Sequence, residues 1–80
     1  MKDKFDDLTK AEQVIQILKF GEKIDQRISK DYDINLFQID NCFAEIWYHH
    51  NTNSIVKAKI VDNESVLNNY PKMIGLPEIN

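Results

Sequence analysis

The chain has 80 residues, one cysteine (Cys42) and a formal net charge of −3 at pH 7. Its length predicts a single small domain over residues 1–80, without an internal disulfide. The excess of acidic over basic residues, without any basic run, disfavours nucleic acid as a partner. The N-terminus has no apolar signal region, and no stretch approaches the roughly 20 apolar residues of a membrane span. We therefore expect a cytoplasmic protein that does not enter the membrane.

The first predicted element is a long N-terminal helix over residues 9–30. Thr9 and Glu12 have the spacing of a capping box, in which each side chain accepts a hydrogen bond from the backbone amide of the other residue. Apolar residues then share one helical face: Val14, Ile17, Leu18, Ile24 and Ile28. Gly21 lies inside this stripe and indicates either close packing or a break in the helix. One continuous helix is the favoured interpretation.

Three antiparallel strands are predicted after this helix. Apolar residues at alternating positions predict the first strand over residues 35–39, and Asp40 and Asn41 are typical of a tight turn. The run FAEIWYHHNTNSIVKAKIV, residues 43–61, predicts a hairpin of the second and third strands. Its three-residue loop ends at Asn53, a residue type that tolerates the left-handed conformation.

The register of the hairpin follows from its charges. With a three-residue loop, Glu45 lies opposite Lys59 and Trp47 opposite Lys57. The other face then holds apolar pairs: Tyr48 with Val56, Ile46 with Ala58, and Ala44 with Ile60. A two-residue loop would place Glu45 opposite Ile60. Because opposite charges across a strand pair are favourable, the first register is predicted.

A short C-terminal helix over residues 64–70 follows, with Asp62 or Asn63 as its cap and Pro71 after its end. Residues 72–80 are predicted to form an extended apolar tail. The sequence therefore predicts an α+β domain in which the long N-terminal helix packs on a three-stranded antiparallel β-meander.

The hairpin pattern, FAEIWY followed by turn residues and SIVKAKIV, resembles a hairpin in small uncharacterised bacterial proteins. The resemblance covers residues 43–67. It implies the same arrangement of a helix followed by a three-stranded meander, and it carries no activity or site residues.

The hairpin has apolar residues on both faces. The helix is expected to cover the face that holds Ile46 and Tyr48. On the opposite face, the aliphatic stem of Lys57 can lie on the indole of Trp47. That face is covered either by lysine stems and the C-terminal tail or by another protein. It supplies the predicted protein interface: Phe43, Trp47, Ile55, Lys57 and Val61.

No group of residues predicts catalysis, a cofactor or a metal site. His49 and His50 are adjacent in a strand and point to opposite faces, so one ion would not easily bind both. Cys42 has no helix N-terminus or basic cluster to activate its thiol. Glu45 is a carboxylate inside an apolar strand, and Lys59 is its expected structural partner.

The sequence thus predicts a non-enzymatic protein-interaction domain that associates with itself or with another protein. One alternative is an inhibitor, immunity-type or regulatory protein that binds a basic partner through acidic residues: Asp3, Asp6, Asp7 and Glu12. A second alternative is a small-ligand binder with a pocket between helix and sheet, near Gly21.

Overall fold

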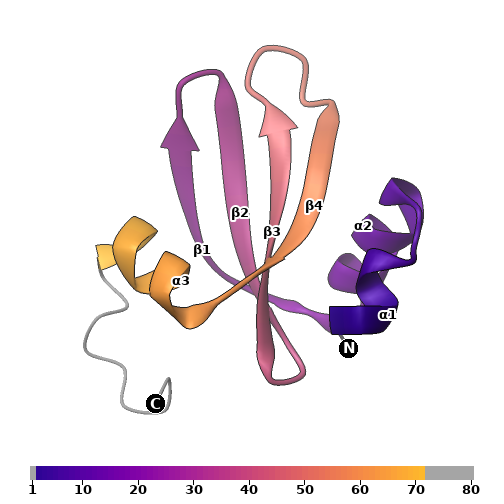
Figure 1. The fold of residues 1–80 in the computed structure, drawn as a ribbon. Helices are drawn as coiled ribbons and strands as arrows, with labels where there is room; N and C mark the ends of the chain where they lie inside the picture. Colours follow the sequence, from indigo (N-terminus) through magenta and orange to yellow (C-terminus); the bar gives the residue numbers. More distant parts are fainter. Residues whose placement is uncertain (1, 72–80) are drawn as a thin grey trace.

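The computed structural model describes residues 2–71 (Figure 1), so the predicted tail over residues 72–80 lies outside the described residues. Two helices come first, and four strands and a third helix follow: α1 (Lys2–Asp6), α2 (Lys10–Phe20), β1 (Glu22–Ser29), β2 (Tyr32–Ile39), β3 (Cys42–His49), β4 (Ile55–Val61) and α3 (Asn63–Asn69). Consecutive strands pair antiparallel in the order β1-β2-β3-β4. The α+β class is confirmed, and the meander has four strands instead of the predicted three.

The helix predicted over residues 9–30 is wrong in its second half. α2 begins with the predicted capping box, in which both hydrogen bonds between Thr9 and Glu12 are formed. It ends at Gly21, whose backbone is extended, and the chain continues as β1. A Cβ atom on Gly21 would lie 2.6 Å from the carbonyl oxygen of Ile17, closer than real Cβ atoms approach. The break in the helix, which the sequence left as the alternative, therefore lies at a position where a side chain would not fit.

A β-bulge in β1 separates two isoleucines that the sequence pattern assigned to one helical face. Ile24 and Ile28 have the i, i+4 spacing of a helical face, but the pairing of β1 with β2 shifts between Lys23 and Asp25. As a result, Ile24 packs with α3, whereas Ile28 lies opposite Asp33 and is 71% exposed. The two isoleucines therefore lie on opposite faces of a strand.

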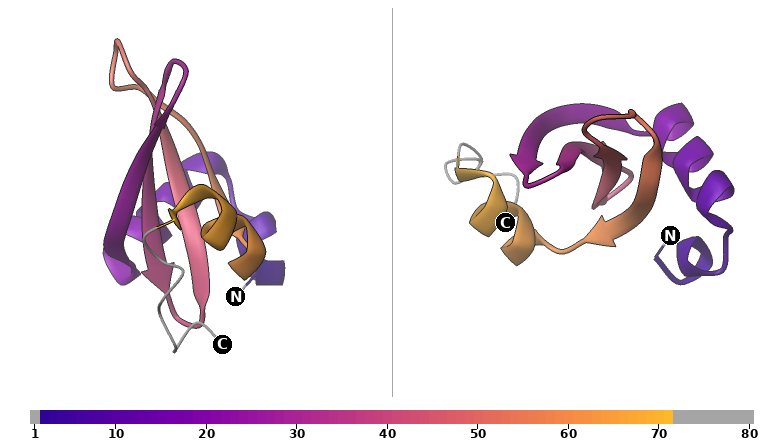
Figure 2. Two further views of the ribbon diagram at one scale, coloured as in Figure 1. Left: turned by 90° about the vertical axis from the view of Figure 1, so that its left-hand side faces the viewer. Right: turned by 90° about the horizontal axis from the view of Figure 1, so that it is seen from above.

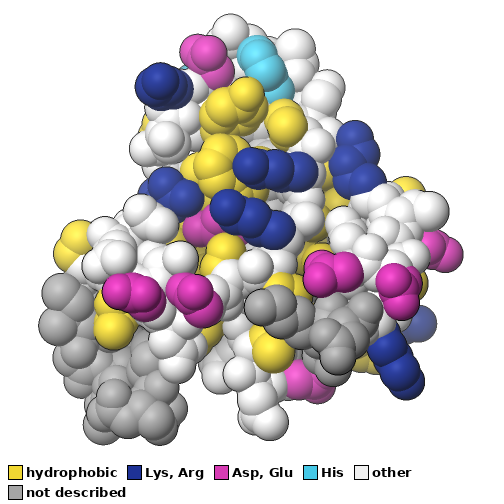
Figure 3. All heavy atoms as spheres, in the orientation of Figure 1, with side chains coloured by type: hydrophobic (Ala, Val, Ile, Leu, Met, Phe, Trp, Pro, Cys, Tyr) yellow, Lys and Arg dark blue, Asp and Glu magenta, His cyan; other side chains and the backbone are white. Residues whose placement is uncertain are grey.

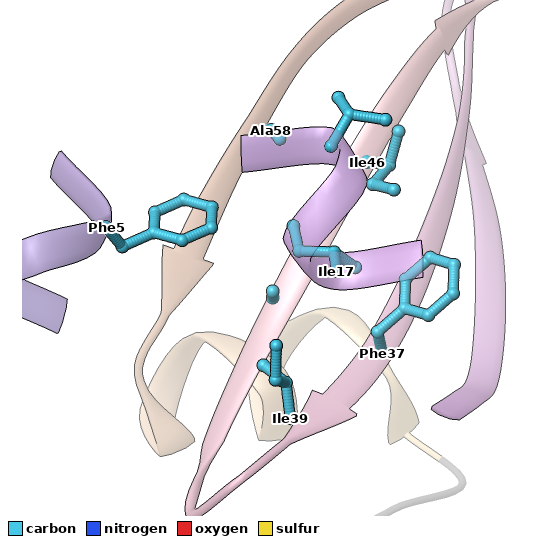
Figure 4. Close-up of a cluster of buried hydrophobic side chains, with 8 residues drawn as sticks. Phe5, Ile17, Phe37, Ile39, Ile46 and Ala58 are labelled. Atoms are coloured by element: carbon cyan, nitrogen blue, oxygen red, sulfur yellow. The ribbon is translucent and has the colours of Figure 1, made fainter. Parts of the chain in front are cut away.

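Helices cover both faces of the curved sheet (Figure 2). On one side, called the α2 face, side chains of α1 and α2 pack against side chains of β2, β3 and β4 (Figure 4). The helices contribute Phe5, Val14 and Ile17, and the strands contribute Phe37, Ile39, Ala44, Ile46 and Ala58. On the other side, called the α3 face, a smaller cluster lies under α3: Leu36, Phe43, Val66 and Tyr70. The buried strand β3 thus has apolar residues at both parities because each of its faces is covered in part by a helix.

The predicted hairpin register is confirmed over most of its length. Glu45 pairs with Lys59 and Trp47 with Lys57, and the apolar pairs Ile46–Ala58 and Ala44–Ile60 are also formed. The predicted partner of Tyr48 is wrong, because a register shift after Trp47 pairs it with Ile55 and leaves Val56 unpaired. Asn53 has the predicted left-handed conformation, with φ 58°.

The C-terminal helix agrees with its prediction. The side chain of Asp62 caps α3 by accepting a hydrogen bond of 2.8 Å from the backbone amide of Ser65, and the helix ends before Tyr70. Its buried residue, Val66, anchors it to the sheet. Across the described range 2–71, no helix has the length and apolar character needed to cross a membrane.

Candidate functional site

The open part of the α3 face is centred on Trp47. The Nζ atoms of Lys57 and Lys59 lie 4.0 and 5.2 Å from the centroid of the Trp47 ring, and the Cζ atom of Arg27 lies 5.4 Å from it. The ring of Tyr32 lies beside them, with its centroid 5.4 Å from that of Trp47. We call these five residues the Trp47 face. In Figure 3, Lys and Arg side chains gather around hydrophobic ones over the strands.

The sheet register brings these side chains together. Arg27, Ile34, Trp47 and Lys57 are successive cross-strand partners, so they form one row across all four strands. Because facing residues in a sheet lie on the same side, Arg27 and Lys57 approach the indole from the two outer strands. Ile34, the β2 member of this row, is fully buried.

Glu45 lies at the base of the Trp47 face and is only 2% exposed. One of its oxygens, Oε1, accepts a hydrogen bond of 3.0 Å from Nε1 of Trp47. The other, Oε2, accepts bonds from Nη2 of Arg27 at 3.3 Å and from the hydroxyl of Tyr70 at 2.8 Å. A buried carboxylate needs such donors because they replace the water that it has lost. Lys59 lies opposite Glu45 in the sheet, but the prediction that it is the ion-pair partner of Glu45 is wrong. That partner is Arg27.

Tyr70 connects α3 to this network. Its hydroxyl donates to Glu45 and accepts a bond of 3.3 Å from Nε of Arg27. Burial raises the pKa of the Tyr70 hydroxyl far above its usual range, and the hydrogen bond to Glu45 acts in the same direction. Tyr70 therefore stays protonated at neutral pH and donates to the carboxylate. α3 thereby helps to fix the orientation of the indole above Glu45.

His49 extends the aromatic surface towards the tip of the hairpins. Its ring makes an edge contact with Tyr32, at 6.2 Å between centroids. Its Nδ1 atom is buried and has no hydrogen-bond partner within the described part of the chain. Tyr32 thus contacts both Trp47 and His49, and the three rings form one continuous surface.

The structure separates the five predicted interface residues. Trp47 and Lys57 lie together on the open surface, as predicted. Phe43 is buried, and Val61 packs beside it, both in the cluster under α3. Ile55 packs against the core of the α2 face, since the bulge at Val56 shifts its pairing. That these residues bind a partner stays a prediction.

Three members of the Trp47 face were not among the predicted interface residues. Arg27 was missed because its segment was assigned to the long helix. The signal that could have placed it is the polar pair Lys30 and Asp31, which forms the turn between β1 and β2. Lys59 was assigned to Glu45, and Tyr32 preceded the predicted start of its strand.

Other candidate regions have less defined geometry. An open recess of about 390 Å³ lies along β1 and β2, lined by Lys23, Gln26, Arg27, Ile28, Asp33, Asn35, Tyr48 and Asn53. It does not include Gly21, where a pocket was expected. A Cβ atom added to Gly21 would already contact Phe37 and Gln38 at 3.4 Å, so the space there is filled.

Of the acidic residues proposed for a basic partner, Glu12 is used in the capping box, and Asp6 and Asp7 are exposed. The side chain of Asp3 lies outside the described part. Between residues 2 and 71, no three His, Cys, Asp or Glu side chains come together as a metal site would require.

No protein-family model, no curated protein and no solved structure matches this chain. The function is therefore inferred from the geometry of the Trp47 face, and the resemblance of the hairpin to small bacterial proteins stays untested.

Proposed function

We propose that this protein is a non-enzymatic interaction domain that binds another protein, or a second copy of itself, through the Trp47 face. One observation carries the proposal: a half-buried tryptophan lies in the centre of an open sheet surface, held at Nε1 by a buried carboxylate. Trp, Tyr and Arg are the residue types most enriched at the energetic centres of protein interfaces, and this surface contains all three.

The rigidity of the surface supports the proposal. Binding loses free energy when side chains that were mobile become ordered, by about 0.5–1.5 kcal/mol for each flexible side chain. Glu45 already orders Trp47 and Arg27 in the unbound chain. Little further ordering would be needed on binding. As part of the same proposal, the protein acts in the cytoplasm, where its single cysteine needs no disulfide partner.

The test compares matched baits. Tagged wild-type protein, Trp47→Ala and Ile28→Ala are used for affinity capture with quantitative mass spectrometry, and for sedimentation over a range of concentrations. Ile28 is 71% exposed and lies on the α2 face, so its replacement controls for the general loss of apolar surface. We expect Trp47→Ala to weaken association without unfolding the monomer, while Ile28→Ala retains it.

A second variant covers the case in which Trp47→Ala disturbs the fold. Lys57→Glu leaves the hydrogen bond between Trp47 and Glu45 in place and changes only an exposed side chain. Circular dichroism verifies that each variant is folded. Two results together would contradict the proposal. The wild-type protein stays monomeric at high concentration, and every protein that it captures is captured equally by Trp47→Ala.

A further inference from the structure

The Trp47 face carries positive charge that the described chain does not neutralise. The two ion pairs within the described residues are Arg27–Glu45 and His50–Asp33. Lys57 and Lys59 therefore have no carboxylate within 4.0 Å among those residues. Three cations minus the one carboxylate beneath them leave a local charge of +2, on a chain whose net charge is −3. The partner of this surface should supply the missing negative charge.

The spacing of the two lysines indicates the shape of that partner. Lys57 and Lys59 are two residues apart in β4, so they project from the same face about 6.6–6.8 Å apart along the strand. Alternate side chains of any extended peptide have this same spacing. Carboxylates at positions i and i+2 of an extended segment therefore match the two ammonium groups. The rings of Trp47 and Tyr32 offer contact to an apolar side chain at a further alternate position, which projects from the same face of the segment.

We propose that the Trp47 face recognises a short acidic segment of a partner protein. The segment places carboxylates against Lys57 and Lys59 and an apolar side chain against Trp47 and Tyr32. This inference rests on the proposed function, because it names the chemistry of the partner that the same face would bind.

The surroundings of the face favour a short acidic peptide over a nucleic acid. Acidic side chains lie next to the positive area, over α3 and near the N-terminal helices (Figure 3). Glu64 on α3, Asp6 at the end of α1 and Asp7 directly after it are exposed acidic residues of these elements. A nucleic acid carries a charge on every nucleotide and would extend from the lysines onto this acidic surface. A segment of a few residues can end before it.

Trp47 provides a direct measurement, since it is the only tryptophan in the chain. Its fluorescence and the NMR resonance of its indole N–H are followed while three probes are added. The probes are a short oligoglutamate with one central leucine, the same peptide with glutamine in place of glutamate, and an oligothymidylate of equal length. We expect a saturable change with the glutamate peptide only, and weaker binding as salt is raised.

A double variant tests the role of the lysines. We expect Lys57→Gln with Lys59→Gln to weaken binding of the glutamate peptide about tenfold, in line with the removal of two exposed ion pairs. Lys4→Gln with Lys19→Gln makes the same change in net charge at exposed positions outside the face and should leave binding unchanged.

Three results would overturn the inference: no response to the glutamate peptide, equal binding of the glutamine peptide, or tighter binding of the oligothymidylate. If the glutamate peptide fails while a partner protein is still captured in a Trp47-dependent manner, the acidic segment is wrong and the interaction domain stands. If the peptide binds but no captured protein depends on Trp47, the interaction domain as proposed is the part that fails.

Discussion

At the scale of single residues, Glu45 determines the geometry of the candidate site. A charge in the interior of a small domain costs several kcal/mol unless hydrogen bonds and an opposite charge compensate it. Here the compensating groups come from β1, from β3 and from the residue that follows α3: Arg27, Trp47 and Tyr70. The same bonds that stabilise the carboxylate hold the indole in one orientation. The stability of the fold and the shape of the Trp47 face are therefore coupled through one side chain.

Replacement of Tyr70 by phenylalanine should change how stability depends on pH. The pKa of Tyr70 is raised in the folded state, so its contribution is fully present below the unfolded pKa of about 10. It is lost as the pH rises above that value, because the unfolded state then releases the proton and the folded state does not. The wild-type protein should therefore lose stability above about pH 10, and Tyr70→Phe should lose less.

Urea unfolding at a series of pH values measures this effect. At neutral pH, Tyr70→Phe should be less stable by about 1–3 kcal/mol, since Glu45 loses a buried donor. Tyr48→Phe is the matched control, because Tyr48 is a half-buried tyrosine that packs on the α2 face, away from Glu45. Parallel pH profiles for wild type and Tyr70→Phe would show that the hydroxyl does not titrate differently in the two states.

At the scale of elements, α2 has one buried and one exposed apolar side. Val14 and Ile17 pack on the sheet, and Ile17 is fully buried. Ile15 and Leu18 are 60% and 53% exposed. The helix is therefore attached through a narrow stripe.

The same substitution on the two sides of α2 should have very different costs. Ile17→Ala should lower the free energy of unfolding by about 2–5 kcal/mol, because it leaves a cavity in the core. Ile15→Ala should change it by no more than about 0.5 kcal/mol, as is usual for surface positions. Denaturant unfolding of the two variants measures both values. Equal losses would show that Ile15 is covered in solution, for example by a second chain.

Short-range signals predicted much of the fold. The capping box at Thr9, the turn at Asp40–Asn41 and the cap at Asp62 depend only on neighbouring residues, and all are present. The cross-strand register that places Glu45 opposite Lys59 was also predicted, because the other register would have placed Glu45 opposite Ile60.

Two of the errors arose at bulges. A bulge in β1 places Ile24 and Ile28 on opposite faces, although their spacing is that of a helix. A second bulge at Val56 moves Ile55 to the α2 face. For the candidate site, Trp47 and Lys57 could be predicted as direct cross-strand neighbours. The burial of Phe43 could not, since it depends on where α3 docks.

At the scale of the whole molecule, one sheet separates two hydrophobic clusters. Neither cluster is large, and both use side chains of β2 and β3. Because β2 and β3 contribute side chains to both clusters, disruption of one cluster also displaces residues that the other cluster needs. The chain is expected to unfold as a single cooperative unit.

Variants on the two sides of the sheet should therefore shift the same transition. Val66→Ala removes a fully buried side chain under α3 and should cost about 1–3 kcal/mol. Its unfolding, followed by Trp47 fluorescence and by far-ultraviolet circular dichroism, should give coincident curves, and Ile17→Ala should do the same. Earlier loss of the fluorescence signal in Val66→Ala would instead show that α3 detaches separately.

The two edge strands of the sheet have a consequence for aggregation. Within the described chain, β1 and β4 each have a strand on one side only, so the sheet has two free edges. Free edges can pair with other chains and seed amyloid-like growth, and natural proteins counter this with charged side chains and bulges. β4 carries Lys57 and Lys59, and bulges interrupt the pairing of both outer strands. Replacement of these lysines by apolar residues would therefore raise the risk of aggregation at the edge of β4.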